Sequence, residues 1–275
     1  MTINCKGQLI DLSTPKVMGI FNVTPDSFYD GGKYKDEASI LNQVETMLLQ
    51  NATFIDIGGY SSRPGADFVS EQEELNRVVP IVELILKHFP EILISIDTFR
   101  SEVANESIGA GAALINDISA GKLDLNMLST IGKLGVPYIM MHMKGNPQTM
   151  QQQTQYENLL NDIISYFGEQ IAKAHAEKII DIIIDPGFGF AKTLEQNFEL
   201  LHKFELLQMI NKPLLAGVSR KSMIYKTLNS SAHNALNGTT ALHMVALQKG
   251  AKILRVHDVK EAMECITLYN QLESN

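Results

Sequence analysis

A single (β/α)8 barrel of the α/β class is the fold that the sequence predicts, with residues 1–14 as a short N-terminal hairpin and residues 15–275 as one barrel domain. Eight short apolar runs recur along the chain, each typical of a buried parallel strand, and helical periodicity fills the segments between them. A doubly wound sheet usually has fewer strands and a glycine fingerprint after its first strand, which this chain lacks. The count of eight therefore favours a closed barrel.

The expected elements follow one another in order. Residues 1–12 alternate apolar and polar residues around Lys6 and Gly7, which predicts the hairpin. Strands are expected at residues 16–21, 54–58, 92–96, 113–115, 137–141, 179–184, 213–218 and 252–256. Helices are expected, among other places, at residues 38–49, 71–87, 101–108, 156–174 and 234–248. No linker or low-complexity stretch interrupts this alternation, so we expect one domain.

Composition and charge exclude several classes of protein. The chain has 275 residues and is 45% hydrophobic, which is ample for a sizeable core. A net charge of -8 and a pI near 5.4 argue against a broad surface for nucleic acids or anionic membranes. No apolar run approaches the roughly 18 residues that span a bilayer, so we expect no membrane insertion. Cys5 and Cys265 lack metal-ligand spacing and the N-terminus lacks the order of a signal peptide, which indicates a reducing cytoplasm.

Polar residues follow the predicted strands, each at the carboxyl end. Active sites of (β/α)8 barrels lie at this end of the strands, so these side chains outline one pocket. They are Asn22, Tyr60, Ser61, Asp97, Thr98, Asn116, Asp117, His142, Asp185, Ser219, Arg220, Lys221, His257 and Asp258.

The most informative of these strand ends is at Asp185. Three isoleucines precede it, and Pro186 and Gly187 follow it directly. A charge at the end of a buried strand costs several kcal/mol unless it is paired, so Asp185 either caps the next helix or binds a ligand that offers donors. The same alternatives stand elsewhere on the rim, since Asp97 could be a helix N-cap with Thr98, and Asn116 or Asp117 could be a turn residue.

Four rim residues together suit a flat nitrogen heterocycle. Asp97 and Asp185 offer carboxylates, Asn116 an amide and Lys221 an ammonium group. A carboxylate that pairs with adjacent ring N–H and amino groups makes a strong, planar contact. Pterins and guanine-like rings have such an edge.

A second set of residues suits a diphosphate. Arg255 and His257 alternate on one side of the last predicted strand, and Arg63 lies in the loop after the second. Asn22 begins a loop whose oxygens could help to hold Mg²⁺, a hard ion that takes a few protein ligands together with phosphate and water. Taken alone, Arg63 could equally be a solvated loop charge.

With these residues in place, nearly the whole chain resembles the dihydropteroate synthase family. The motifs that carry the resemblance lie in order at the strand ends. They are residues 19–28 (GIFNVTPDSF), 61–65 (SSRPG), 95–98 (SIDT), 115–117 (IND), 141–143 (MHM), 185–190 (DPGFGF), 219–222 (SRKS) and 255–258 (RVHD).

The resemblance implies a folate-pathway transferase that joins 6-hydroxymethyl-7,8-dihydropterin diphosphate to 4-aminobenzoate and releases diphosphate. It implies a pterin site at Asp97, Asn116, Asp185 and Lys221, with Arg255 stacked on the ring. It assigns the diphosphate to Asn22, Arg63, Arg255 and His257, with Asn22 also binding Mg²⁺. It places the aminobenzoate among Ser62, Pro64, Phe190, Lys221 and Ser222. A homodimer and a response to sulfonamides are further expectations from the resemblance.

Two residues depart from the family's usual pattern, namely Tyr60 in place of an acid and Ser62 in place of threonine. Two other functions stay open. A methyl-transfer pterin domain would handle no diphosphate, and a non-catalytic pterin-binding paralogue would keep the ring pocket but lack turnover. For the synthase reaction we expect electrostatic stabilisation of the leaving diphosphate, because no nucleophile elbow accompanies the rim serines.

Overall fold

The computed structural model describes residues 1–23, 33–60 and 68–274, and its central feature is a closed barrel of parallel strands. Eight strands pair side by side in the order β10-β3-β4-β5-β6-β7-β8-β9. The strands are β3 (Lys16–Asn22), β4 (Phe54–Gly58), β5 (Leu93–Asp97), β6 (Leu114–Asp117), β7 (Tyr138–Met141), β8 (Ile182–Asp185), β9 (Leu214–Ala216) and β10 (Ala251–Val256). The predicted (β/α)8 barrel is confirmed.

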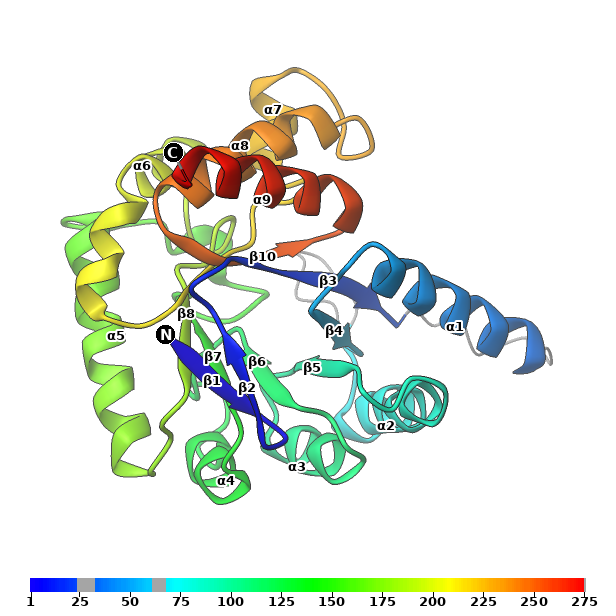
Figure 1. The fold of residues 1–275 in the computed structure, drawn as a ribbon. Helices are drawn as coiled ribbons and strands as arrows, with labels where there is room; N and C mark the ends of the chain where they lie inside the picture. The colour runs from blue at the N-terminus through cyan, green and yellow to red at the C-terminus, as the bar shows by residue number, and fades with distance from the viewer. Residues whose placement is uncertain (24–32, 61–67, 275) are drawn as a thin grey trace.

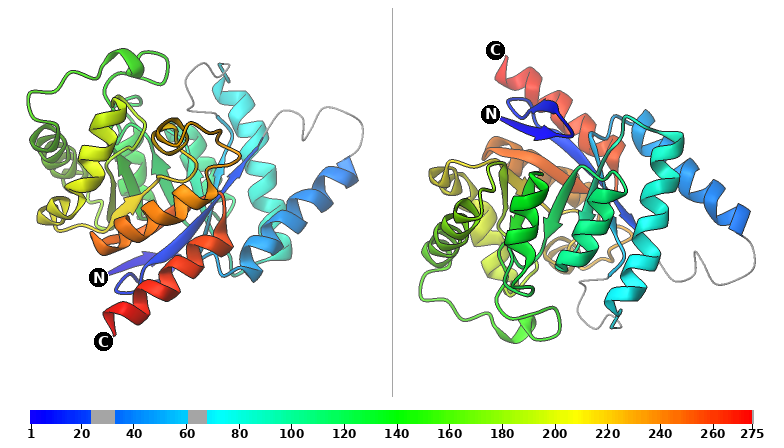
Figure 2. Two further views of the ribbon diagram at one scale, coloured as in Figure 1. Left: turned by 90° about the horizontal axis from the view of Figure 1, so that it is seen from above. Right: turned by 90° about the horizontal axis from the view of Figure 1, so that it is seen from below.

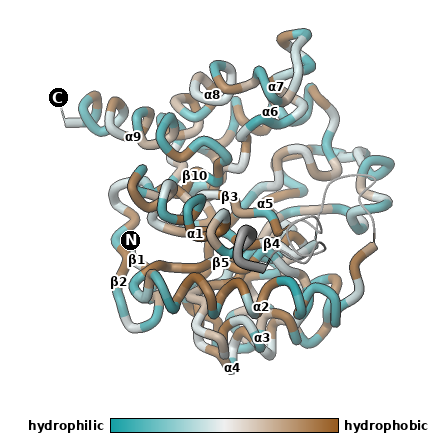
Figure 3. Tube along the Cα trace, turned by 90° about the vertical axis from the view of Figure 1, so that its right-hand side faces the viewer, coloured by the Kyte–Doolittle hydropathy of each residue, from teal (hydrophilic) through white to brown (hydrophobic). Residues whose placement is uncertain are grey.

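Helices cover the outside of the barrel (Figure 2). They are α1 (Lys33–Leu49), α2 (Glu71–His88), α3 (Ser101–Gly109), α4 (Met127–Leu134), α5 (Leu159–Ala176), α6 (Leu194–His202), α7 (Ser222–Thr227), α8 (Leu236–Gln248) and α9 (Val259–Glu273), with 3-10 turns η2 (Met150–Gln152) and η3 (Phe204–Ile210). Polar and apolar residues alternate along α2, which buries one face (Figure 3). Among the described residues, no helix is long and apolar enough to cross a membrane.

The N-terminal hairpin closes one end of the barrel (Figure 1). Strands β1 (Thr2–Cys5) and β2 (Gln8–Asp11) pair antiparallel, and the turn between them takes positive φ at Lys6 (54°) and Gly7 (82°). This arrangement confirms the predicted hairpin. The hairpin's apolar side chains, Ile3, Cys5, Ile10 and Leu12, pack in one cluster with residues from the amino ends of the barrel strands.

Successive layers of side chains inside the barrel change from apolar to polar. The layer against the hairpin includes Phe54, Leu93, Leu114, Ile183 and Ile253, all buried in one cluster. Side chains two residues further along a strand point to the same side. The next layer toward the carboxyl ends therefore contains Asp56, Ser95, Asn116, Asp185 and Arg255. The strand pattern thus places charged groups directly above an apolar floor.

One buried histidine outside this interior makes stability depend on pH. His243 of α8 is 1% exposed, and neither ring nitrogen has a hydrogen-bond partner among the described residues. Burial lowers its pKa from 6.5 to about 4, so unfolding raises its proton affinity. The stability that neutral His243 contributes is therefore complete above about pH 6.5 and is lost as pH falls toward 4, on the order of 3 kcal/mol in all.

We therefore expect the His243→Leu variant to lose less stability than the unaltered chain between pH 7 and pH 4.5. Urea unfolding at several pH values measures the difference. Exposed His88→Leu provides the control and should leave the pH dependence unchanged. If the unfolding free energies of the unaltered chain and of His243→Leu fell equally with pH, His243 would not be the source of the pH dependence.

Candidate active site

A polar cavity of about 820 Å³ lies at the carboxyl ends of the barrel strands. Side chains from most of the barrel strands or the loops after them converge on it. Its lining includes Asn22, Tyr60, Asp97, Met150, Gln151, Phe190, Lys192, Ser219, Lys221, Ser222, Arg255 and His257. Most of the predicted rim residues of the described chain thus gather in one place, with Asn116 and Asp185 buried on the strands beneath, whereas His142 is not among the lining residues and contacts Lys192 and Tyr166 instead. Ser62, Arg63 and Pro64 lie outside the described residues.

Arg255 lies between two carboxylates. Its Nε donates to Asp56 Oδ2 at 2.6 Å, and a terminal nitrogen donates to Asp97 Oδ2 at 2.7 Å. Burial alone would lower the pKa of Arg255, but Asp56 and Asp97 raise it above its ordinary value. Burial, opposed by the charge of Arg255 and reinforced by that of Asp56, raises the pKa of Asp97 to about 7. A small change of environment, such as a bound ligand with ring donors, can therefore decide whether Asp97 holds a proton.

The structure separates Asn116 from the neighbouring Asp117. Asn116 is inside the barrel, where its Nδ2 donates to Asp56 Oδ2 at 3.1 Å. Asp117 points the other way and accepts from the hydroxyl of Tyr138 at 2.5 Å and from the backbone of Ser119 at 2.7 Å. Asp117 is therefore a structural residue of the turn after β6, which confirms the turn role for Asp117, whereas Asn116 faces the barrel interior.

The helix-cap alternatives for Asp97 and Asp185 are wrong. The N-cap position of α3 is Arg100, which makes no side-chain cap, whereas Asp97 pairs with Arg255. Helix α6 has a capping box built from Thr193 and Gln196, well beyond Asp185. Neither carboxylate is therefore used to begin a helix.

Asp185 is held by the tight turn that follows it. Its Oδ1 accepts from the backbone N–H of Gly187 at 2.8 Å. Gly187 has φ 73°, and a Cβ there would lie 2.2 Å from the carbonyl oxygen of His142, so only glycine fits. Burial raises the pKa of Asp185, and the charge of Lys221 partly opposes this rise.

Lys221 and Phe190 form one wall of the cavity. Lys221 Nζ lies 4.8 Å from the centroid of the Phe190 ring and donates to the carbonyl of Phe188. Burial lowers the pKa of Lys221 to about 8, while Asp185 opposes the shift. Ser222, the next residue, begins helix α7. A cation and an aromatic face thus stand together above Asp185.

His257 follows β10, which is separated from β8 by β9 alone, and it lines the mouth of the cavity. Its Nδ1 is 3.0 Å from the hydroxyl of Ser219, which also accepts from the backbone N–H of His257 at 3.1 Å. Arg220 binds both oxygens of Asp258, at 2.8 and 2.7 Å, and so ties the loop after β9 to the loop after β10. These bonds fix the ring of His257 at the rim.

Asn22 ends β3 at the cavity and is exposed. Its amide oxygen is a ligand of the hard type that Mg²⁺ prefers. In the part of the chain that the structure describes, no three His, Cys, Asp or Glu side chains cluster as a metal cage would require. A single amide oxygen fits an ion that takes its remaining ligands from diphosphate and water.

Sequence reasoning missed three contributors to the site. Asp56 is buried mid-strand beneath Arg255. Lys192 is buried at the cavity and donates to the carbonyls of Gly187 and Phe190, each at 3.0 Å. The loop after β7 reaches across the mouth, where Gln148 Nε2 donates to the hydroxyl of Tyr60 at 2.9 Å. Of these three contributors, only Asp56 could have been noticed in the sequence, because it is a charged residue inside an apolar run.

Lys192 fixes the turn that carries Phe190. Its Nζ also lies 3.0 Å from His142 Nδ1, and burial lowers its pKa to about 7.

We expect Lys192→Met to lose about 1–3 kcal/mol of unfolding free energy at pH 9, because the two carbonyls lose their donor. Urea unfolding measures the loss. Lys203→Met removes a half-exposed ion pair with Glu199 and should lose less than about 0.5 kcal/mol. Equal losses would contradict the role of Lys192.

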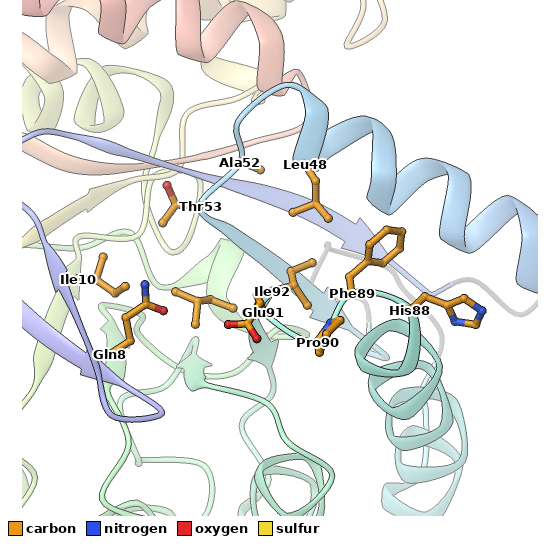
Figure 4. Close-up of a pocket in the computed structure, with 11 residues that line it drawn as sticks. Gln8, Ile10, Leu48, Ala52, Thr53, His88, Phe89, Pro90, Glu91 and Ile92 are labelled. Carbon is orange, nitrogen blue, oxygen red and sulfur yellow. The ribbon is translucent and has the colours of Figure 1, made fainter.

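The opposite end of the barrel has a shallower depression of about 510 Å³ beside the hairpin (Figure 4). Gln8, Thr53, His88 and Glu91 are its polar lining residues, among apolar residues such as Phe89. Their side chains do not converge on a common point as those at the carboxyl ends do. The candidate active site is therefore the cavity at the carboxyl ends.

Comparison with known proteins agrees with this geometry. The model of the pterin binding enzyme family matches residues 18–257. The dihydropteroate synthase of Escherichia coli K12 is 44% identical over 268 residues, which cover 97% of this chain and 94% of that protein. The chain belongs to the dihydropteroate synthase family. The Haemophilus influenzae family member is 43% identical over 98% of each protein.

Solved structures of the family have the same fold. The Yersinia pestis dihydropteroate synthase in a sulfonamide drug complex has a TM-score of 0.93 and 43% identity, with both chains fully covered. The Xanthomonas albilineans dihydropteroate synthase with 4-aminobenzoic acid has a TM-score of 0.91 and 35% identity, covering 100% of this chain and 98% of that one. These family members share the barrel whose carboxyl ends form the cavity described above.

Proposed function

We propose that this chain is a dihydropteroate synthase, a transferase that joins 6-hydroxymethyl-7,8-dihydropterin diphosphate to 4-aminobenzoate and gives 7,8-dihydropteroate and diphosphate. The observation that carries the proposal is the convergence of Asp97, Lys221, Arg255 and His257 on one cavity above Asn116 and Asp185. Family membership adds the reaction that such a site performs.

The pterin ring binds deepest in this proposal. Asp185 and Asp97 accept from ring N–H and amino groups, Asn116 adds an amide, and Lys221 donates. The raised pKa values of Asp97 and Asp185 reflect carboxylates buried in an apolar barrel, which favour a ligand that supplies donors. The guanidinium of Arg255 lies over the same interior and provides the stacking surface.

The diphosphate binds at the rim, at Asn22, Arg63, Arg255 and His257. Mg²⁺, when bound, neutralises charge on the departing diphosphate, and Asn22 is the residue that would hold it. Cationic side chains and the fixed ring of His257 stabilise the negative charge that develops as the carbon–oxygen bond breaks. No covalent intermediate with the protein is required.

The aminobenzoate binds nearer the mouth, among Ser62, Pro64, Phe190, Lys221 and Ser222. The ring face of Phe190 and the adjacent cation of Lys221 suit an aromatic carboxylate. Its amino group then faces the methylene that carries the diphosphate, so attack releases diphosphate and a proton. We also propose that the protein acts in the cytoplasm as a homodimer.

Turnover tests this function. Purified protein mixed with the dihydropterin diphosphate, 4-aminobenzoate and Mg²⁺ should release one diphosphate for each dihydropteroate formed. A non-catalytic pterin-binding paralogue would bind the pterin without release, and a methyl-transfer domain would bind a folate and ignore the diphosphate. Either result would replace the synthase assignment.

A further inference from the structure

Asp56 contacts two of the proposed ring-binding residues at once. Its Oδ2 accepts from Arg255 Nε at 2.6 Å and from Asn116 Nδ2 at 3.1 Å. Its side chain is fully buried on β4, one layer below the cavity that Asp97 lines. Asp56 is not among the residues that line the cavity, and its Oδ2 contacts two residues of its own layer instead.

The contact with Asp56 decides how the Asn116 amide is oriented. An asparagine can present either its NH₂ or its oxygen to a neighbour. Asp56 Oδ2 already accepts from Arg255, so it offers Asn116 an acceptor, and the NH₂ group must face it. The Asn116 oxygen is then the atom left to meet a ligand. If the amide were reversed, two oxygens would face each other in the buried interior at a cost of about 1–3 kcal/mol.

Asp56 also constrains Arg255. Two carboxylates, Asp56 and Asp97, bind different nitrogens of one guanidinium, which fixes the plane of that group. With Asp97 alone, the guanidinium could rotate about a single contact. The same buried oxygen thus sets the orientation of an amide and of a cation that come from β6 and β10.

We infer that Asp56 is a positioning residue for the heterocycle, acting through Asn116 and Arg255 so that the site presents an acceptor and a flat cation to the ring. This inference rests on the proposed function for the identity of the ring. It assigns Asp56 no contact with the ligand.

A double-mutant cycle between Asp56 and Asn116 tests the inference. The affinity for 6-hydroxymethyl-7,8-dihydropterin diphosphate is measured by calorimetry for the unaltered chain, D56A, N116A and the double variant. We expect D56A to weaken binding about 30-fold and to cost little more once Asn116 is absent, with a coupling of at least about tenfold. The inference would be overturned if D56A bound the pterin as tightly as the unaltered chain. It would also be overturned if the fold-losses of affinity in D56A and N116A simply multiplied in the double variant.

A conservative variant separates positioning from simple packing. In D56N, the asparagine oxygen can replace Oδ2 and keep both contacts, so affinity should stay within about fivefold of the unaltered chain. The control S95A removes a hydroxyl from the same barrel layer, at the position that pairs in register with Asp56, and should leave affinity within about twofold. If D56N bound the dihydropterin diphosphate as weakly as D56A does, the inference would be overturned.

One measurement needs no change at position 56. The Asn116 side-chain NH₂, assigned by its loss in N116D, should exchange slowly with solvent in the unaltered chain because it is buried and hydrogen-bonded. Rapid exchange in a folded protein would overturn the inference even if D56A failed to fold. Failure of the proposed function looks different, since the unaltered chain would then bind the pterin but release no diphosphate, or would not bind it.

Discussion

Asp185→Asn is expected to weaken binding of the dihydropterin diphosphate by at least about 30-fold while the protein stays folded. The amide oxygen can still accept from Gly187, which preserves the turn. Its NH₂ group, however, must face a ligand donor where a carboxylate oxygen accepted before. A buried donor left unpaired costs about 1–3 kcal/mol, and the lost charge adds to this cost. Calorimetric titration measures the change.

Asp117→Asn is the matched control for this prediction. Asp117 is also a fully buried acid at the end of a barrel strand, but its oxygens bind Ser119, Gly121 and Tyr138. The control should lower stability and leave the affinity nearly unchanged. If Asp185→Asn binds as tightly as the unaltered chain, Asp185 is not a ring-binding residue.

Arg255→Met is expected to lose about 3–5 kcal/mol of unfolding free energy at pH 8, because Asp56 and Asp97 then lose their shared cation in the interior. Burial raises the pKa of Asp97 to about 7, and loss of the opposing charge of Arg255 raises it further in the variant. The penalty for charged Asp97 is therefore fully present above the folded pKa and disappears as pH falls and the acid binds a proton. The loss at pH 5 should thus be smaller than at pH 8.

Urea unfolding of Arg255→Met at the two pH values measures both effects. Arg220→Met is the control, since Arg220 also binds a carboxylate, that of Asp258, in a more solvated position. Its loss should be about 1 kcal/mol and should depend little on pH in this range. A pH-independent loss in Arg255→Met would mean that the two acids are not held apart from water as described.

The barrel was predictable because a buried parallel strand is an apolar run that a sequence displays directly. Strand β4 has the predicted bounds, residues 54–58. The predicted bounds were wrong where apolar residues continue outside the sheet. The strand predicted at residues 179–184 begins only at Ile182, because Ile180 is 81% exposed and lies before β8. Helix α1 begins at residue 33, five residues before the predicted start.

The residues behind the site were not predictable in this way. Asp56 shows in the sequence only as a charge within an apolar run, and its partner Arg255 is 199 residues away. Lys192 likewise depends on His142, 50 residues earlier, and on two carbonyls of a turn. Strand ends reveal which side chains meet at the rim, because parallel strands share a direction. They do not reveal which buried groups orient those side chains.

The hairpin of β1 and β2 and the apolar layer above it fill the amino end of the barrel, so the described cavity opens at the carboxyl ends of the strands. Asn116 and Asp185 lie beneath this cavity, and Phe190 and Ser222 line it. With the proposed assignments, the pterin, which binds deepest, must enter before the aminobenzoate and cannot leave until the aminobenzoate has left. The joined product, which spans both positions, must withdraw lengthwise through the same opening. The diphosphate, at the rim, is the one species free to escape while the rest of the site is filled.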